Sequence, residues 1–309
     1  MNDSPGLGAV LPATCNSRLP HCFSAAGEGS YQLDRTFCAR HNDPPEKRYL
    51  AFAMTTELPF DDYRTSHLGK GDEYHDKFSR FAYTSVIWEL EQRQMLDLVA
   101  SQFTESASAK HMDFACGTGR ILALLESIVG SSTGVDISDS MLAVAGERAK
   151  NARLICTDLT RSQELAGEKF DLITSFRLFP NAEPQLREEV MAQLSARLAP
   201  GGRLIFNNHK RCGSLAFRWR SFLTRIGLKR NKKPLHCMSD EEAVQLAARH
   251  GLELIAERHL GVLPILRRKR PLLPKAFMRR VEAWAATRPG LARHAAFKIY
   301  VFQPVPATS

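Results

Sequence analysis

The sequence predicts an α/β protein built on a doubly wound, mostly parallel sheet. Short apolar segments of strand length alternate with segments of helical period, which is the pattern of strands joined by crossover helices. A turn with two closely spaced glycines follows the first apolar segment, in "DFACGTGR" at 113–120. Seven segments have the length and composition of strands: 110–116, 132–138, 152–159, 170–176, 203–209, 252–260 and 297–303.

Helical segments lie before and between these strands. Within 74–100, residues recur at spacings of three, four and seven, which predicts a helix ahead of the first strand. Further helices are expected from Arg120, from Asp139 and over 184–198, the last ending at the breaker "APGG". The core face expected for the first helix comprises Phe78, Phe81, Ser85, Trp88, Met95 and Val99.

The first 53 residues differ in composition from the rest. They are rich in Pro, Gly, Ser and Asn and show no sustained period, so we interpret 1–53 as a disordered extension of a domain at 54–309. The N-terminus lacks the basic start and long apolar core of a secretory signal. No apolar run approaches the ~20 residues that a membrane span needs. We therefore expect a cytoplasmic protein.

The cysteine pattern also agrees with a cytoplasmic protein. The chain has seven cysteines, an odd number, and no pair has C-x-x-C spacing. This pattern argues against a disulfide framework and against a zinc ribbon. We expect reduced thiols and no metal site.

The net charge of +9 is concentrated in one part of the chain. Residues 207–294 contain 20 Lys and Arg against 6 Asp and Glu, a balance of +14, which leaves −5 for the remainder. Such an asymmetry predicts an anionic partner, namely a nucleic acid, a membrane surface or an acidic substrate.

The glycine turn narrows the class of ligand. Gly117 and Gly119 allow close approach of the backbone to a ligand, but Leu122 occupies the position where a dinucleotide site has its third glycine. The G-x-x-x-x-G-K-[ST] pattern of a P-loop is absent. Asp113 lies just before the turn, where it would repel a pyrophosphate and attract a ligand carrying an amino group.

With these features "DFACGTGR" resembles the first motif of class I S-adenosylmethionine-dependent methyltransferases, D/E-x-x-x-G-x-G, and the resemblance extends over residues 74–303. It implies a Rossmann-like sheet of seven strands with the last one antiparallel, and S-adenosylmethionine as cofactor. It also implies cap helices at 74–109, a cofactor-binding core at 110–209, and a basic helical lid insertion between strands five and seven, at 210–250 and 262–295.

The resemblance assigns cofactor roles to individual residues. Asp136, at the end of the second strand, would bind both ribose hydroxyls, and Asp158 would accept a hydrogen bond from the adenine amine. Asp113 would face the methionine ammonium group. The other implied contacts are Ala115, Cys116, Gly117, Thr118 and Gly119 in the turn, Ile137 and Met141 beside the adenine, the backbone of Leu159, and Ser175 and Phe176.

The end of the fourth strand bears on the acceptor. Methyltransferases that modify exocyclic amines of nucleic-acid bases usually carry [ND]-P-P-[YF] there, whereas this chain has "SFRLFPNAEP" at 175–184. This stretch is more similar to methyltransferases of small metabolites, sugars or lipid-linked acceptors. Nucleic acid is therefore the less favoured acceptor.

His209 and Arg177 are the candidate catalytic residues. His209 follows the fifth strand, and the unperturbed pKa of a histidine, ~6.5, suits a general base. The alternative is that His209 only hydrogen-bonds a loop. Arg177 would bind an anionic group of the acceptor or pair with a neighbouring acid. The remaining candidates for substrate contact are Tyr74, His75, Asn181, Asn207 and Trp219.

Two basic amphipathic helices are expected in the C-terminal half. Within 214–233 an apolar face is formed by Leu215, Trp219, Phe222, Leu223 and Ile226, and within 274–288 by Phe277, Val281, Trp284 and Ala285. Such helices pack on the domain as a lid, or they contact an anionic membrane surface, an anionic or lipid-linked substrate, or nucleic acid.

The sequence therefore predicts methyl transfer, most simply to an oxygen of a small-molecule or lipid- or glycan-linked acceptor. Two alternatives stay open. One is an RNA or protein methyltransferase that docks through its basic half. The other is a protein that binds the cofactor without turnover.

Overall fold

A computed structural model describes residues 63–66, 82–103, 105–228, 237–262 and 273–306. The predicted extension at 1–53 and the candidates Tyr74 and His75 lie outside these residues. The described helices are α2 (Tyr63–Ser66), α4 (Ala82–Gln102), η1 (Ser106–Ser108), α5 (Arg120–Leu125), α6 (Asp139–Arg148), α7 (Pro184–Arg197), α8 (Leu215–Arg225), α9 (Asp240–Arg249), α10 (Lys275–Ala286) and α11 (Pro289–Ala292).

The strands form one seven-stranded sheet in the order β3-β2-β1-β4-β5-β7-β6. β7 is antiparallel to both of its neighbours, and the pairs among β1 to β5 are parallel. The predicted α/β class, doubly wound sheet and antiparallel last strand are therefore confirmed. Their bounds are β1 Lys110–Phe114, β2 Ser131–Asp136, β3 Arg153–Cys156, β4 Phe170–Ser175, β5 Leu198–Asn208, β6 Leu252–Leu260 and β7 Phe297–Pro304.

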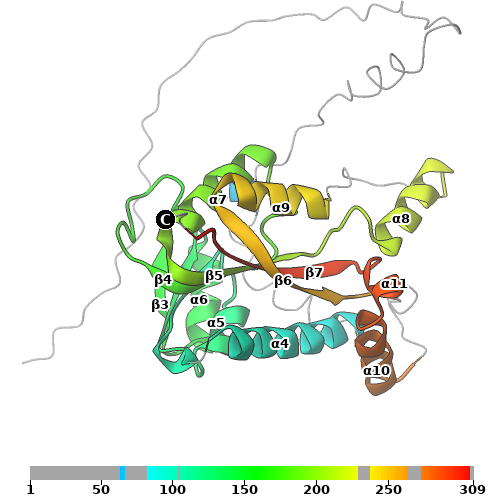
Figure 1. The fold of residues 1–309 in the computed structure, drawn as a ribbon, viewed down its shortest axis with the longest axis horizontal. Helices are drawn as coiled ribbons and strands as arrows, with labels where there is room; N and C mark the ends of the chain where they lie inside the picture. The colour runs from blue at the N-terminus through cyan, green and yellow to red at the C-terminus, as the bar shows by residue number, and fades with distance from the viewer. Residues whose placement is uncertain (1–62, 67–81, 104, 229–236, 263–272, 307–309) are drawn as a thin grey trace, which may run out of the picture. The chain divides into compact units, whose positions relative to one another are not determined.

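Successive side chains of a strand point to opposite faces of the sheet. Helices cover both faces here, so the central strands are buried on both sides. In β5, Leu204 and Phe206 join the hydrophobic cluster under α7 and α9, whereas Ile205 joins the cluster with α4 and α10. Figure 1 shows α7 and α9 above the sheet and α4 below it. β4 and β5 contain apolar runs for this reason, whereas β1 and β2 also bury the polar residues His111, Asp113, Ser132 and Thr133.

Several predicted boundaries move by a few residues. The helix before the first strand is described from Ala82, and its buried residues include Val86 and Leu90, while Ser85 and Trp88 are only partly buried. Asp139 is the first residue of α6, and the cap is Ser138, whose hydroxyl accepts a hydrogen bond from the Met141 amide at 3.4 Å. α7 ends at Arg197, and β5 begins directly at Leu198.

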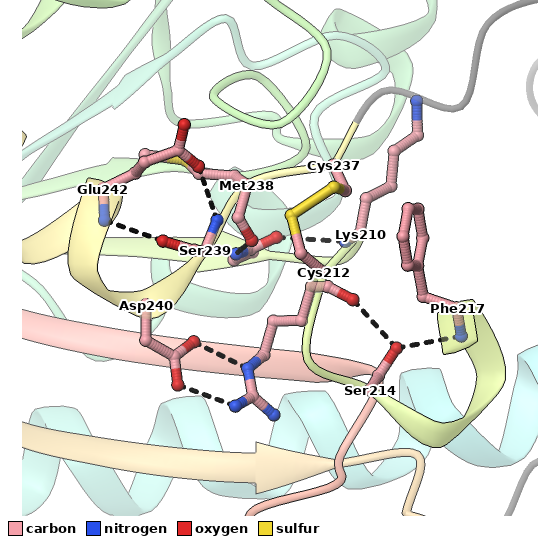
Figure 2. Close-up of a disulfide and its surroundings, with 11 residues drawn as sticks. Lys210, Cys212, Ser214, Phe217, Cys237, Met238, Ser239, Asp240 and Glu242 are labelled. Atoms are coloured by element: carbon pink, nitrogen blue, oxygen red, sulfur yellow. Dashed lines mark hydrogen bonds and ion pairs between the residues drawn. A yellow bond between two sulfur atoms is a disulfide. The ribbon is translucent and has the colours of Figure 1, made fainter. Parts of the chain in front are cut away.

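One expectation from the C-terminal half is wrong. Cys212 and Cys237 form a disulfide, with 5.2 Å between their Cα atoms, where reduced thiols were predicted (Figure 2). A count of cysteines without C-x-x-C spacing cannot reveal a pair that the fold brings together over 25 positions. In the described chain Cys116 and Cys156 keep free thiols.

The apolar faces predicted for α8 and α10 are largely exposed. α8 buries none of its residues, and Trp219 and Phe222 are 62% and 50% exposed. In α10 the predicted Phe277 and Trp284 are exposed, whereas the predicted Ala285 is buried together with Met278 and Glu282. Within the described ranges, no helix has the length and apolarity required to cross a membrane.

Candidate active site

The turn between β1 and α5 has a backbone that few residues tolerate. Ala115, Gly117 and Gly119 have φ values of 55°, 54° and 69°, in the left-handed region. A Cβ added at Gly119 would lie 2.9 Å from the Cα of Ala145, so this glycine lets α5 approach α6 closely. A Cβ added at Gly117 would meet nothing within 4 Å, so this position faces open space. The turn therefore presents backbone to a cavity.

Asp136 at the end of β2 is joined to this turn. Its Oδ2 accepts a hydrogen bond from the amide of Gly117 at 2.8 Å, and its Oδ1 accepts one from the amide of Ser138 at 3.0 Å. A carboxylate has about four lone-pair positions, so it can accept from more than one donor at a time. The predicted ribose contact is compatible with this arrangement because the backbone bonds fix the orientation of the carboxylate.

A pocket of about 910 Å³, including open solvent at its mouth, lies at the carboxyl ends of β1, β2 and β4. This is the edge, next to the reversal of strand order, where doubly wound sheets bind ligands. The lining combines carboxylates with apolar walls suited to a flat heterocycle. It consists of Tyr63, Arg64, Phe114, Ala115, Cys116, Gly117, Thr118, Arg120, Val135, Asp136, Ile137, Met141, Thr157, Asp158, Thr160, Phe176, Arg177, Leu178, Leu186 and Val190.

Asp158 is held by a segment that the sequence did not single out. The Arg64 guanidinium on α2 donates to Asp158 Oδ2 at 3.0 Å, while the amide and hydroxyl of Thr160 donate to Oδ1 at 2.9 and 2.6 Å. Despite partial burial, these hydrogen bonds from Thr160 and Arg64 lower the pKa of Asp158. The carboxylate predicted to meet the adenine amine is thus ionised and already hydrogen-bonded on both oxygens.

Asp113 lies within β1 rather than on the pocket wall. It is 2% exposed, and Thr174 of β4 donates to its Oδ1 at 2.6 Å. Burial raises the pKa of Asp113 to about 7; the nearby Asp136 charge adds to the rise, and the Thr174 bond and the Arg120 charge oppose it. A cationic ligand near this carboxyl would favour its ionised form.

A buried histidine completes this hydrogen-bonded chain. His111 Nε2 lies 2.9 Å from Thr174 Oγ1, and Nδ1 lies 3.1 Å from Ser132 Oγ. Burial lowers the pKa of His111 to about 3, so the ring is neutral. Because Thr174 donates its proton to Asp113, its oxygen accepts from Nε2–H, and Nδ1 accepts from Ser132. Three strands are linked below the turn by side chains that were not among the predicted site residues.

On the acceptor side of the site, Arg177 is paired with an acid on α4. Its Nη2 lies 3.2 Å from Glu91 Oε2, and Glu91 is 1% exposed. Asn207 connects the same groups, since its Nδ2 donates to Glu91 Oε1 at 2.8 Å and its Oδ1 accepts from the Arg177 amide at 2.7 Å. Of the two roles considered for Arg177, the ion pair to a neighbouring acid is the one present in this structure.

His209 lies beside two other candidates. The Asn181 side-chain amide donates to the Arg177 carbonyl, and it also lies 3.5 Å from His209 Nε2. Arg177, Asn181, Asn207 and His209 therefore form one connected group. Arg177 lines the pocket, whereas the other three are not among its lining residues.

Some of the other predicted site residues also line the pocket, and some do not. The pocket wall includes Ala115, Cys116, Gly117, Thr118, Asp136, Ile137, Met141, Asp158 and Phe176. Asp113, Gly119, Leu159, Ser175 and Trp219 lie outside it. Ser175 is fully buried, and its hydroxyl has no hydrogen-bond partner among the described residues, while Trp219 is exposed on α8.

Three residues at the site were not predicted from the sequence, namely Tyr63, Arg64 and Glu91. Glu91 had a readable signal, because it interrupts the apolar i, i+4 series Ile87–Glu91–Met95 of a helix, and a buried acid in such a position needs a partner. α2 is only four residues long, and Tyr63 and Arg64 lie far from the motifs in sequence. No local pattern distinguishes them.

Fold and site together define the class. The sheet is mostly parallel, has this strand order and contains β7 as an inserted antiparallel strand. A glycine turn faces a carboxylate at the end of β2. This combination is the Rossmann-like methyltransferase fold. In agreement, residues 112–202 match the family model described as "Methyltransferase domain". That segment contains the turn, Asp136, Asp158 and most of the pocket wall.

Two curated relatives each match about a third of the chain. Malonyl-[acyl-carrier protein] O-methyltransferase of Bacillus cereus is 29% identical over 120 residues, covering 37% of this chain and 42% of the relative. A dTDP-4-amino-2,3,4,6-tetradeoxy-D-glucose N,N-dimethyltransferase of Saccharopolyspora spinosa is 30% identical over 118 residues, covering 37% and 45%. The match thus spans less than half the length of either relative.

Solved structures resemble a larger share of the chain. The magnesium protoporphyrin IX methyltransferase of Synechocystis, solved with bound SAH, has a TM-score of 0.55 at 12% identity and covers 77% of this chain and 96% of that one. An S-adenosylmethionine-dependent methyltransferase from Clostridium acetobutylicum has a TM-score of 0.52 at 14% identity and covers 76% and 98%. At these identities the likeness supports the fold alone.

Proposed function

We propose that the protein binds S-adenosylmethionine and catalyses methyl transfer from it. The observation that carries this proposal is the Gly117–Asp136 hydrogen bond of 2.8 Å, which aligns an open, positive-φ turn with an oriented carboxylate at the rim of the pocket. A carboxylate in this position suits the hydroxyls of a ribose. The apolar walls formed by Ile137 and Met141 suit an adenine ring.

The residues of the chain fit the other parts of such a cofactor. The open space before Gly117 accommodates backbone contact, and an ammonium group near Asp113 would favour the ionised form of this carboxyl. When bound, the cofactor supplies a methyl group already activated on a positively charged sulfur. The work left to the protein is alignment of the acceptor and exclusion of water.

We further propose that the acceptor atom is an oxygen on a small-molecule or lipid- or glycan-linked compound. The stretch "SFRLFPNAEP" lacks the [ND]-P-P-[YF] pattern of enzymes acting on base amines. One of the two curated relatives is named as an O-methyltransferase of malonyl-[acyl-carrier protein] and the other as an N,N-dimethyltransferase of a dTDP-linked amino sugar. Both names support a metabolite acceptor, and their difference makes the acceptor atom a matter for experiment.

In this proposal His209 removes the acceptor proton, and Arg177 positions the acceptor. Asn181 lies between the two, bonded to the Arg177 carbonyl and next to His209 Nε2. The Glu91–Arg177 ion pair holds the guanidinium at the pocket wall. Arg177 is therefore oriented before an acceptor arrives.

Calorimetric titration with S-adenosylhomocysteine tests the cofactor, with NAD as a parallel ligand. We expect binding of the nucleoside and none of NAD, in the full chain and in a chain starting at Met54. Asp136→Ala should abolish binding, whereas Asp139→Ala, an exposed acid three residues further, should preserve it. Binding of NAD, or equal affinity of Asp136→Ala and the parent, would overturn the proposal.

Labelled methyl transfer tests the acceptor. Total RNA, total protein and a small-molecule or lipid extract are offered separately, and label is expected in the extract. His209→Ala should then lower turnover without weakening S-adenosylhomocysteine binding, because His209 is not on the pocket wall. Label in RNA or protein would refute the acceptor class, and binding without transfer in any fraction would favour a non-catalytic protein.

A further inference from the structure

We propose that α8 and α10 together form a docking surface for an anionic lipid bilayer. We call it the aromatic–basic surface. Its apolar members are Leu215, Trp219, Phe222, Ile226, Leu228, Leu273, Phe277 and Trp284. The proposal concerns where the protein lies in the cell and does not depend on the proposed methyl transfer.

The aromatic–basic surface holds most of the exposed apolar side chains. Eleven large hydrophobic residues of the described chain are exposed, and only Leu96, Ile255 and Val305 lie elsewhere, which leaves eight in these two segments. Trp219 and Phe222 lie side by side, with 5.8 Å between ring centroids. Scattered exposed hydrophobics need no explanation, but a concentration of this kind marks an interaction site.

Within these two segments the exposed charges have one sign. In the described parts of the two segments, 211–228 and 273–296, the single acid is Glu282, which is 1% exposed. Glu282 is internal, because it accepts hydrogen bonds from the Tyr83 hydroxyl at 3.0 Å and the Val262 amide at 2.8 Å. The exposed cations are Arg218, Arg220, Arg225, Lys275, Arg280, Arg288 and Arg293.

Strand register places both helices at one end of the sheet. Asn208, which precedes α8, pairs with Lys298, and Leu260 pairs with Phe297 just after α11. Because β5 is parallel to β4, this is also the end that carries the pocket. Figure 1 shows α8, α11 and α10 following one another at this end. A bilayer bound here would lie near the pocket mouth.

The base of α8 is fixed to its surroundings. The Arg211 guanidinium donates to the carbonyls of Arg293 and Ala295 at 3.1 and 2.7 Å, and the Leu215 amide donates to the His294 carbonyl at 3.3 Å. The Cys212–Cys237 disulfide lies beside this junction (Figure 2). α8 is thus anchored at one end while its apolar residues stay in solvent.

Anionic lipid suits these features better than the other partners. Interfacial helices combine Trp, Phe and Leu with Arg or Lys, bury the apolar side chains at the acyl boundary and pair the cations with headgroups. Nucleic acid would use the cations but gain little from exposed Leu, Ile and Phe. A second copy of this surface would bring the seven cations of each copy together.

The three tryptophans provide a direct test. Trp219 and Trp284 belong to the surface, whereas Trp88 lies on α4 under the Arg120 guanidinium, 4.8 Å from its ring. Variants that keep one tryptophan each, with Phe at the other two positions, are mixed with phosphatidylcholine vesicles with and without phosphatidylglycerol. With phosphatidylglycerol present, we expect the fluorescence emission of Trp219 and of Trp284 to shift to the blue and to be quenched by brominated lipid. Without phosphatidylglycerol neither change should occur. The emission of Trp88 should be the same in all cases.

Sedimentation with vesicles supplies the matched controls. Trp219→Ser with Phe222→Ser should weaken association at least tenfold, and Ile255→Ser with Val305→Ser should leave it unchanged. All four side chains are partly exposed, so both variants should keep the thermal midpoint of the parent.

Three outcomes would overturn the proposal. One is no association with anionic vesicles. Another is tighter binding to transfer RNA at equal phosphate concentration. The third is a dimer by light scattering whose Trp219 emission is already shifted without lipid, which would indicate a second copy on this surface.

Discussion

Arg64 and Asp158, which both line the pocket, form an ion pair with 3.0 Å between Nε and Oδ2. The same guanidinium donates through Nη2 to Thr160 Oγ1 at 2.8 Å and to Glu189 Oε2 at 2.6 Å. One side chain of α2 thereby connects the end of β3 to α7. Because the paired side chains are 17% and 23% exposed, solvent screens this contact less than it screens a surface pair. The four-residue helix α2 is thus held in place by the ion pairs of Arg64 with Asp158 and Glu189.

Replacing Arg64 should therefore loosen the site. In Arg64→Ala we expect S-adenosylhomocysteine to dissociate faster and to bind about five- to tenfold more weakly, which corresponds to about 1–1.4 kcal/mol. Stopped-flow displacement and calorimetry measure the two quantities.

Arg161 offers a matched control for this experiment. It also lies near Asp158 Oδ2, at 3.9 Å, but its side chain is 72% exposed. Arg161→Ala should bind like the parent. Tighter binding by Arg64→Ala would mean instead that Arg64 competes with the ligand for Asp158.

Asp113 should give the fold a distinct dependence on pH. Its pKa in the folded protein is about 7, against 3.8 for an ordinary carboxyl, so folding takes up a proton between these values. The parent should lose stability as the pH rises through this window and no more above it. Between pH 5 and 8 the free energy of unfolding should fall by roughly 3 kcal/mol, because about two pH units of this interval lie below the pKa of the folded protein.

An amide at this position can still accept from Thr174 but does not ionise. Asp113→Asn should thus be stabilised relative to the parent at pH 8, with the difference shrinking by roughly 3 kcal/mol at pH 5. Urea unfolding at both pH values measures it. Asp97→Asn, at an exposed position on α4, serves as control. A constant difference between Asp113→Asn and the parent at both pH values would contradict the explanation by burial.

The sheet and the cofactor side of the site could be predicted from sequence because their signals are local. Strands buried on both faces are apolar runs, and the turn needs glycine wherever a Cβ would collide, as at Gly119 beside Ala145. Asp136 follows from its position at the end of a strand after such a turn. These features are set within about 25 residues of one another.

The contacts that were missed are between distant parts of the chain. Arg64 meets Asp158 across 94 positions, and Glu91 meets Arg177 across 86. The apolar residues of α8 have helical period whether they face a core or solvent, so periodicity predicted the helix and left its environment open. Burial depends on what the fold places opposite a face.

Three substitutions separate the two roles of glycine in this fold. Gly119→Ala combines a φ of 69° with a Cβ 2.9 Å from Ala145, whereas Gly167→Ala has a φ of 80° and open space around it. We expect a loss of about 1–2 kcal/mol for Gly167→Ala, from backbone strain alone, and at least 1 kcal/mol more for Gly119→Ala.

Ala115→Gly is the reverse case. Ala115 already has a φ of 55°, so glycine relieves strain but gives the unfolded chain more freedom. These opposing effects should leave stability within about 1 kcal/mol of the parent. Urea unfolding of all three variants checks the order, and equal losses for Gly119→Ala and Gly167→Ala would refute the packing argument.

The Cys212–Cys237 disulfide should contribute to stability through the unfolded state. It links positions 25 residues apart, and closing a loop of this length lowers the entropy of the unfolded chain by an amount equivalent to about 3 kcal/mol. We expect Cys212→Ser to lose up to this amount in urea unfolding without reductant, and reductant to lower the parent to the level of the variant. Cys156→Ser, which removes an exposed thiol, should have no such effect. Since the bond lies at the base of α8, limited proteolysis should also cut the variant faster between 213 and 228. A parent whose stability is the same with and without reductant would show that the bond does not form in solution.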